Sequence, residues 1–380
     1  MRLAITSLLL CSLPSSLALA EKPQLKQSRL WYAGEDGYDT YRIPGIVVTA
    51  NGTLVAYGVA RRNLKDGDWG DNDIVMRRST DHGKHWEKSR RIAGDSHGVT
   101  DNPVAIASRA GRVLHFLYQH DYANVYYMKS QDDGATFSEP VDITSALTGL
   151  RSQFDWNVVA LGPGHAIELM SGRLLVPVWL AAAKVQANGH RGSGPSGITT
   201  IYSDDQGATW THGDIIALSS SEMKNPNEFQ VIQLADGSVM ANIRTGDRKL
   251  MRAVALSPDG ISHWSKPQFD PHLYDPVCAA GITPYDDRRL LFTNPDSSTL
   301  PRKSNGEGLR QNLTIRLSAD DGKTWPISQL LVMGPTGYSD IAVDPHRKEI
   351  FDIYEMPDDT KSKALSLYIA AFNLEWLEKK

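Results

Sequence analysis

The eight residues SDDQGATW, from Ser203 to Trp210, recur along the chain with small changes. Serine and aspartate side chains hydrogen-bond the amides of a tight turn, glycine adopts a left-handed backbone, and the aromatic ring folds back onto the sheet. Each copy therefore predicts a hairpin turn rather than a binding site. Three copies keep the pattern Ser-x-Asp-x-Gly-x-x-aromatic and a fourth shifts its glycine by one place: STDHGKHW from Ser79, SQDDGATF from Ser130, SADDGKTW from Ser318 and, shifted, SPDGISHW from Ser257.

The spacing of these turns predicts the architecture. They start at residues 79, 130, 203, 257 and 318, which are 51, 73, 54 and 61 residues apart. Such intervals exceed one hairpin and suit a four-stranded antiparallel sheet with its loops, the repeating unit of a β-propeller. Dividing about 360 residues by about 60 gives six blades. We therefore predict an all-β fold, a six-bladed β-propeller of four-stranded antiparallel sheets, with residues 21–380 as one domain.

The N-terminal segment MRLAITSLLLCSLPSSLALA has a basic start, a short apolar stretch and small residues at Ala18 and Ala20. These features predict a secretory signal peptide over residues 1–20, too short and interrupted to span a membrane. Cys11 lies inside it, so Cys278 is the only cysteine of the mature chain. The sequence thus predicts an exported protein that is stabilised by its core and not by disulfides.

The composition narrows the class of partner. The net charge is -4 and the basic residues are scattered, which argues against nucleic acid. The eleven histidines show no metal-ligand spacing, and no glycine-rich phosphate loop precedes a helix. We expect no cofactor, no metal and no further membrane span. Small polar molecules remain as partners, and the sequence gives no indication of the oligomeric state.

The segment YRIPGIV, from Tyr41 to Val47, predicts the first of two strands joined by a turn at residues 50–52. Arg42 lies on this strand, just before a proline that removes a donor from the sheet. Taken alone, the segment is compatible with a surface arginine on a strand edge. The rest of the chain gives Arg42 a second interpretation.

The aspartate-containing turns that follow an Arg-Ile-Pro strand resemble those of the sialidase (neuraminidase) family, glycoside hydrolase family 33. The resemblance runs from YRIPG to the IYE motif that ends at Glu355. In that family three arginines hold the carboxylate of the substrate. Arg42 matches the first and Arg244, sixteen residues after Glu228, the second. Arg310 matches the third, and Arg316 is the less favoured alternative because it leads directly into the last turn motif.

The resemblance also implies a catalytic group. Tyr338, in GYSDIAV, matches the nucleophile, Glu228 the base that takes its proton, and Glu355 the carboxylate that supports Arg42. Sialic acid carries a carboxylate on its anomeric carbon, and the planar guanidinium group binds a carboxylate by paired charge-assisted hydrogen bonds. A neutral tyrosine avoids the repulsion that a carboxylate nucleophile would meet there, and sialidases are the known tyrosine exception among glycosidases.

The acid that protonates the leaving oxygen is harder to assign. The family places it in the loop between the Arg-Ile-Pro hairpin and the first turn motif, which here contains four aspartates. We favour Asp68, with Asp66 and Asp71 as alternatives. Asp73 is the least suitable because it begins an apolar strand and should face the sheet.

Two further positions match residues that bind the sugar in this family. Arg61 and Asp101 would reach hydroxyl groups on the far side of the ring, particularly the 4-hydroxyl, although either could instead be a surface charge or a turn former. Phe154 and Trp156 are plausible walls of the pocket for the acyl-amino group, although aromatic residues near glycine and proline more often serve packing.

The resemblance therefore implies a retaining exo-α-sialidase that removes terminal sialic acid from sialylated glycans or glycoproteins through a covalent tyrosyl intermediate. A retaining enzyme could also transfer the sugar to another acceptor, or form an anhydro product by internal attack. A sialoglycan-binding propeller without turnover is the alternative from another class, and an unrelated propeller hydrolase is a third. The sequons at Asn51 and Asn312 fit a bacterial exported protein, periplasmic or secreted, because a glycan beside Arg310 would obstruct the site.

Overall fold

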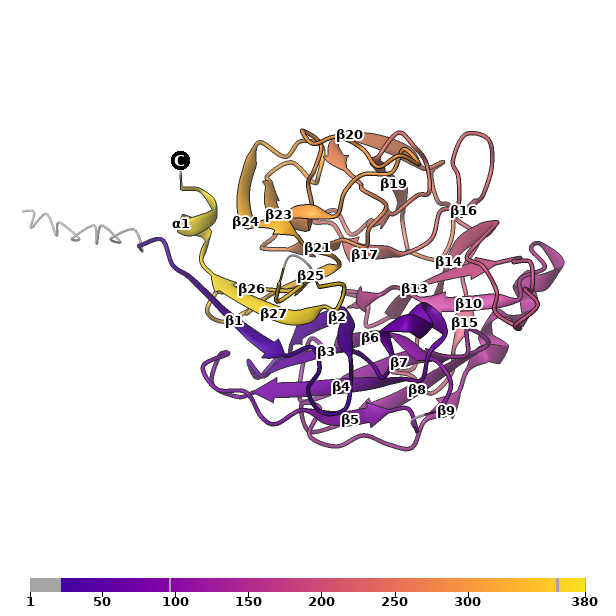
Figure 1. The fold of residues 1–380 in the computed structure, drawn as a ribbon, viewed down its shortest axis with the longest axis horizontal. Coiled ribbons are helices and arrows are strands. Elements are labelled where there is room, and N and C mark those ends of the chain that lie inside the picture. The colour runs from indigo at the N-terminus through magenta and orange to yellow at the C-terminus, as the bar shows by residue number, and fades with distance from the viewer. Residues whose placement is uncertain (1–21, 96, 360–361, 380) are drawn as a thin grey trace, which may run out of the picture.

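The computed structural model describes residues 22–95, 97–359 and 362–379. Within these ranges the chain forms six sheets arranged around a common centre (Figure 1). The prediction of a six-bladed β-propeller is thus confirmed. The predicted signal peptide, residues 1–20 with Cys11, lies outside the described residues.

The first three blades follow the chain from residue 40 to residue 218. Blade 1 consists of β2 (Thr40–Val48), β3 (Leu54–Arg61), β4 (Asn72–Ser79) and β5 (Arg90–Ala93). Blade 2 consists of β6 (Thr100–Ala107), β7 (Leu114–His120), β8 (Asn124–Ser130), β9 (Val141–Asp142) and the short β11 (Gly164–His165), which is parallel to β6. Blade 3 consists of β10 (Val158–Leu161), β13 (Leu174–Ala181), β14 (Ser196–Ser203) and β15 (Thr211–His212), with the short β12 (Ile167–Glu168) and β16 (Ala217–Leu218).

The other three blades have four strands each. Blade 4 consists of β17 (Phe229–Gln233), β18 (Val239–Ile243), β19 (Met251–Ser257) and β20 (Gln268–Tyr274). Blade 5 consists of β21 (Gly281–Pro284), β22 (Leu290–Pro295), β23 (Gln311–Ser318) and β24 (Ile327–Pro335). Blade 6 consists of β25 (Ser339–Val343), β26 (Ile350–Met356), β27 (Ser366–Phe372) and β1 (Leu25–Trp31).

The described helices are short: the 3₁₀ segments η1 (Leu64–Trp69) and η2 (Thr144–Ser152), and α1 (Leu374–Leu377). In the described part of the chain, no helix has the length and apolar character needed to cross a membrane.

The repeated turn motifs lie where the sequence predicts hairpins, between the third and fourth strands of blades 1 to 5. In blade 3 the hydroxyl of Ser203 donates to Asp205 Oδ1 at 2.8 Å and accepts from the amide of Gly207 at 2.8 Å. Gly207 has a φ of 89°, the left-handed backbone that glycine supplies without strain. The shifted motif keeps the bond, because the amide of Gly260 donates to Ser257 Oγ at 2.9 Å.

Blade 6 has no such motif because its fourth strand is not the continuation of its third. The outer strand is β1, which pairs antiparallel with β27. Figure 1 shows the indigo N-terminal strand beside the yellow C-terminal strand. The two ends of the described chain therefore close the ring together, which explains five motifs in six blades.

The core lies between neighbouring blades. Strands such as β3 and β13 are buried along their whole length, because both faces of each sheet pack against the next blade. This packing holds the first strand of each blade at the centre of the ring, where the polar residues described below are placed.

Candidate active site

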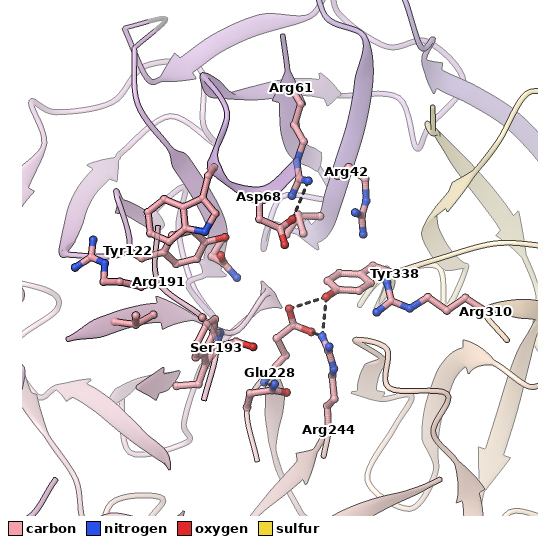
Figure 2. A pocket seen from close by; sticks show the side chains of 17 residues that line it. Arg42, Arg61, Asp68, Tyr122, Arg191, Ser193, Glu228, Arg244, Arg310 and Tyr338 are labelled. Carbon is pink, nitrogen blue, oxygen red and sulfur yellow. Dashed lines mark hydrogen bonds and ion pairs between the residues drawn. The ribbon is translucent and has the colours of Figure 1, made fainter. Parts of the chain in front are cut away.

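A cavity of about 320 Å³ opens at one end of the propeller's centre (Figure 2). Its walls come from the starts of first strands, the ends of second strands and the loops that precede third strands. The repeated turn motifs follow the third strands and so lie at the opposite end of the blades. Seven of the sequence-predicted site residues line the cavity: Arg42, Arg61, Asp68, Glu228, Arg244, Arg310 and Tyr338.

Tyr338 and Glu228 form a direct hydrogen-bonded pair inside this cavity. Tyr338 directly precedes β25 and Glu228 directly precedes β17, so two different blades supply them. The hydroxyl of Tyr338 donates to Glu228 Oε1 at 2.7 Å, and Arg244 Nη1 donates to the Tyr338 oxygen at 2.7 Å. Arg244 also pairs with Glu228 Oε2. The three side chains form the closed set of dashed contacts in Figure 2.

Glu355 joins Arg42 to the backbone of Tyr338. The Glu355 carboxylate is fully buried and accepts from Arg42 Nε at 2.7 Å and from the amide of Ile43 at 2.9 Å. Its other oxygen accepts from the amide of Tyr338 at 2.9 Å. Ile43 has a φ of 53°, a strained conformation for a β-branched residue, at a bulge in the pairing of β2 with β3. The bulge directs the side chain of Arg42 into the cavity, and the hydrogen bond to Glu355 holds it there.

Arg310 is held differently from the other two arginines. Its Nη2 donates to the carbonyl of Val277 at 2.7 Å. Among the described residues, no acidic side chain forms an ion pair with Arg310. Arg316, the alternative, does not line the cavity and pairs instead with Asp296 within blade 5.

Tyr338 lies among three positive charges and is 6% exposed, at the wall of the cavity. Burial raises the pKa of Tyr338 well above the usual value for tyrosine, and the neighbouring arginines oppose this shift only in part. Three guanidinium carbons lie 5.2 to 5.9 Å from the centre of the tyrosine ring, those of Arg310, Arg42 and Arg244. The hydroxyl is therefore neutral until a base takes its proton.

Asp68 faces Tyr338 from across the cavity, on η1 (Figure 2). Its side chain is 66% exposed, and Arg61 Nη1 pairs with it at 2.9 Å. Partial desolvation would raise the pKa of Asp68, but the attraction of Arg61 and Arg42 outweighs it and lowers that pKa below its usual value.

The three other aspartates of this loop do not line the cavity. Asp66 is exposed, and Asp71 accepts from the amide of Gly98 at 2.9 Å. Asp73 is fully buried and accepts from the hydroxyl of Tyr38 at 2.7 Å. Asp73 therefore faces the sheet, as the sequence predicts from the apolar strand that it begins.

Asp101 lies behind Arg61 and not in the cavity wall. It is fully buried, accepts from the side-chain amide of Asn72 at 3.2 Å, and lies 3.5 Å from Arg61 Nη2. Burial raises the pKa of Asp101 to about 6, although the attraction of Arg61 opposes the shift. Asp101 therefore orients Arg61, while the neighbouring Asn102 lines the cavity.

Comparison with known proteins identifies the family of the chain. Residues 43–350 match the family model described as a BNR repeat-like domain. The chain belongs to the BNR repeat-like family. Curated relatives of this chain are the sialidase of Micromonospora viridifaciens, 30% identical over 94% of this chain and 55% of the relative, and the sialidase of Bacteroides fragilis, 28% identical over 79% and 57%. The chain thus spans little more than half the length of these relatives.

A solved structure, the Hadza microbial sialidase Hz136, has the same fold as this BNR repeat-like chain. The TM-score is 0.73 with 24% identity, over 92% of this chain and 69% of the other. Together with the family match and the curated relatives, this similarity confirms the sialidase resemblance that the sequence predicts.

Several residues of the cavity in this BNR repeat-like chain were not predicted. One wall is aromatic and apolar, with Trp69, Tyr122, Val158 and Trp179, and further polar groups come from Asn227 and from the loop that carries Arg191 and Ser193. Asn227 could have been found from its place just before a first strand, beside Glu228. The loop with Arg191 shows no comparable signal.

Of the two interpretations of Phe154 and Trp156, packing is confirmed and the acyl-amino pocket wall is wrong, since neither residue lines the cavity. Trp156 is 2% exposed and packs in the core between blades 2 and 3, where the guanidinium carbon of Arg151 lies 3.9 Å from its ring centre. Phe154 packs against the same core. In the described ranges, no group of three or more His, Cys, Asp or Glu side chains could hold a metal ion.

Proposed function

We propose that this chain is a retaining exo-α-sialidase that removes terminal sialic acid by way of a covalent bond to Tyr338. One observation carries the proposal: the Tyr338 hydroxyl is hydrogen-bonded to the Glu228 carboxylate within a cluster of three arginines that line one cavity. The sialidase names of the curated relatives support the same reaction class. A cavity of about 320 Å³ lies at the lower end of the usual range for ligand pockets, which suits a single terminal sugar.

The arginines would hold the carboxylate that sialic acid carries at its anomeric carbon. Arg310 has no carboxylate partner among the described residues, whereas Arg42 and Arg244 are paired with Glu355 and Glu228. The cluster therefore has a net positive charge directly beside Tyr338. Charge-assisted paired hydrogen bonds from guanidinium groups fix the orientation of the carboxylate as well as its position.

Tyr338 then acts as the nucleophile. Its oxygen forms a bond to the anomeric carbon while its proton moves to Glu228, and the bond from that carbon to the leaving oxygen breaks. The 2.7 Å contact between the two side chains lies within the range that proton transfer requires. Arg244 donates to the same tyrosine oxygen, so it stabilises the negative charge that develops there.

Asp68 supplies the proton of the leaving oxygen and later takes one from the attacking water. Water adds to the anomeric carbon, the bond to the Tyr338 oxygen breaks, and Glu228 returns the proton to the tyrosine. The attraction of Arg61 and Arg42 lowers the pKa of Asp68. A bound substrate carboxylate would offset part of that positive charge and raise the pKa of Asp68, so that a larger fraction of Asp68 carries the proton that the leaving oxygen needs.

The test is release of a fluorescent phenol from an aryl α-sialoside by the purified full chain. We expect turnover that resists a chelator and is lost in Tyr338→Phe but kept in Tyr368→Phe, a tyrosine whose hydroxyl binds Asp358 away from the cavity. A 2,3-difluorosialic acid should add its sugar mass to the peptide that contains Tyr338. Binding of sialic acid without any turnover would instead support a sialoglycan-binding propeller.

Analysis of the sugar product of the same reaction separates the possible activities. Free sialic acid indicates hydrolysis, a sialylated acceptor indicates transfer, and an anhydro sugar indicates internal attack.

We further propose that residues 1–20 direct export and that residues 21–380 form the catalytic domain. The N-terminal sequence of the protein recovered from its host tests this cleavage, which should fall after Ala20.

A further inference from the structure

A second polar pair lies directly below the pair formed by Tyr338 and Glu228. Gln230 Nε2 donates to Asp340 Oδ1 at 2.8 Å. Gln230 follows Glu228 by two residues on β17, and Asp340 follows Tyr338 by two residues on β25. Because side chains two residues apart on a strand point to the same face, the lower pair repeats the upper pair one step deeper in the propeller's centre.

The Asp340 carboxylate forms hydrogen bonds with residues of several blades. Its Oδ1 also accepts from His165 Nδ1 at 2.8 Å, and its Oδ2 accepts from the amide of Ile46 at 3.0 Å. The side-chain oxygen Oε1 of Gln230 accepts from the backbone amide of Ile282 at 2.8 Å. These contacts join β25, β17, β11, β2 and β21. The carboxylate, the amide and the imidazole are all buried, so water does not compete for the hydrogen bonds.

The space around the lower pair leaves little freedom. Gly164, beside Gln230, has a φ of 96°, and a Cβ atom there would lie 2.2 Å from Gln230 Nε2. The amide of Gln230 therefore packs directly on backbone that only glycine can provide. The Gly164 carbonyl is fixed in turn, because the hydroxyl of Tyr57 donates to it at 2.8 Å. The lower pair is thus anchored from the side as well as across the centre.

We propose that Gln230, Asp340 and His165 are positioning residues that set the separation of Tyr338 and Glu228. The inference rests on the proposed function for its kinetic meaning. Proton transfer between the upper pair needs a contact of about 2.6 to 3.2 Å, and a displacement of about 1 Å can cost a hundredfold in rate. Loss of the lower hydrogen bond lets β17 and β25 shift relative to each other, which lengthens that contact.

The carboxylate clamp, formed by Arg42, Arg244 and Arg310, should be affected less than the chemical step. Arg42 is held by Glu355 and Arg310 by the carbonyl of Val277, and neither contact involves the lower pair. Gln230→Met, which keeps the length of the side chain and removes its hydrogen bonds to Asp340 and to the amide of Ile282, should therefore lower kcat by about 10- to 100-fold. KM should change by less than about threefold, since most of the substrate's binding contacts remain.

The matched control is Thr200→Val. Thr200 is fully buried, and its hydroxyl donates to the carbonyl of Gly260 at 2.8 Å. This variant therefore removes a buried hydrogen bond between neighbouring blades, but away from the centre of the propeller. The proposal predicts a lower Tm for both variants but a loss of kcat in Gln230→Met alone. A kcat within twofold of the unchanged protein in a folded Gln230→Met would overturn it.

A second pair of variants decides the matter if Gln230→Met does not fold. His165→Leu removes the donor to Asp340, whereas His165→Asn places a side-chain amide where it can donate to the same carboxylate. The proposal predicts that His165→Leu lowers kcat and that His165→Asn restores most of it. Equal kcat values for these two variants would overturn the proposal.

A spectroscopic measurement separates failure of this inference from failure of the proposed function. If the unchanged protein has no sialidase activity, the proposed function fails, and the position of Tyr338 is followed by ¹⁹F NMR of protein labelled with 3-fluorotyrosine. The Tyr338 signal is assigned by its loss in Tyr338→Phe. We expect it to shift in Gln230→Met and not in Thr200→Val, and an unchanged signal would overturn the positioning role.

Discussion

Replacement of Arg310 by alanine should weaken substrate capture far more than it weakens the fold. Arg310 contributes one hydrogen bond, to the carbonyl of Val277 at 2.7 Å, and among the described residues it has no acidic partner. Arg42 and Arg244 are already paired with Glu355 and Glu228. The charge of Arg310 is therefore the one that a substrate carboxylate neutralises most completely.

The size of the effect follows from the bonds that would be lost. A guanidinium group that holds a carboxylate by two charge-assisted hydrogen bonds contributes about 1.5 to 3 kcal/mol for each, or about 3 to 6 kcal/mol together. Since 1.4 kcal/mol is a factor of ten, kcat/KM should fall by about 10²- to 10⁴-fold, mainly through KM. The fold loses the bond to Val277, which is worth about 1 kcal/mol.

The assay compares three variants on an aryl α-sialoside, together with their melting temperatures. Arg310→Lys keeps the charge without the planar fork and should fall between the alanine variant and the unchanged protein. Arg302→Ala is the control, because Arg302 is exposed on the same loop and, within the described part of the chain, donates only to the carbonyl of Arg248 at 3.1 Å. An unchanged KM in a folded Arg310→Ala would refute the assignment of Arg310 to the carboxylate clamp.

Three further outcomes are expected. Asp68→Asn should slow release of natural sialosides by about 10²- to 10⁴-fold, with Asp66→Asn as the control that retains activity. Glu355→Gln should lower the free energy of unfolding by about 3 to 5 kcal/mol in denaturant titration, because it breaks a buried ion pair, and an unchanged midpoint would contradict this. For Asp101 the folded-state pKa of about 6 lies above an unfolded value of about 3.9, so the folded state binds the proton more tightly. Relative to Asp101→Asn, the unchanged protein should therefore lose up to about 3 kcal/mol of stability as pH rises from about 4 to about 6, and parallel stability curves would show that this carboxyl is not the cause.

The sequence predicts the ring of blades because the turn motif is local chemistry that repeats. A serine, an aspartate and a glycine within five residues form the same hydrogen bonds wherever the motif occurs, as at Ser203 and Ser318. The closing strand Leu25–Trp31 and the short strands β11, β12 and β16 have no such local signal. Their pairing depends on distant segments of the chain, so it becomes visible only when the ring is assembled.

The site residues divide in the same way, into those that local motifs predict and those whose places depend on distant parts of the chain. Residues that extend from short motifs on strand ends, such as Arg42 and Glu228, are brought to one cavity as the sequence predicts. Trp69, Trp179 and Arg191 join them from a short helical turn, a central strand and a loop whose places depend on packing. For Trp156 the sequence left two interpretations, a pocket wall and packing, and only the folded chain decides for packing, because its ring is covered by Arg151 and the core of blades 2 and 3.

Asp68 differs from the other proposed catalytic groups because no inner strand holds it. It lies on η1, directly after Gly67 with its φ of 60°, and its side chain is 66% exposed at the side of the cavity opposite Tyr338. A proton donor for the leaving oxygen has to stand where the rest of the glycan leaves the cavity, so exposure suits this role. Its effect should then depend on the leaving group. An activated phenol leaves with little protonation, whereas a sugar hydroxyl needs a proton. Asp68→Asn should therefore lose much more activity on a sialylated sugar than on the aryl α-sialoside. Equal losses on the two substrates would mean that Asp68 acts in the attack of water and not in departure of the glycan.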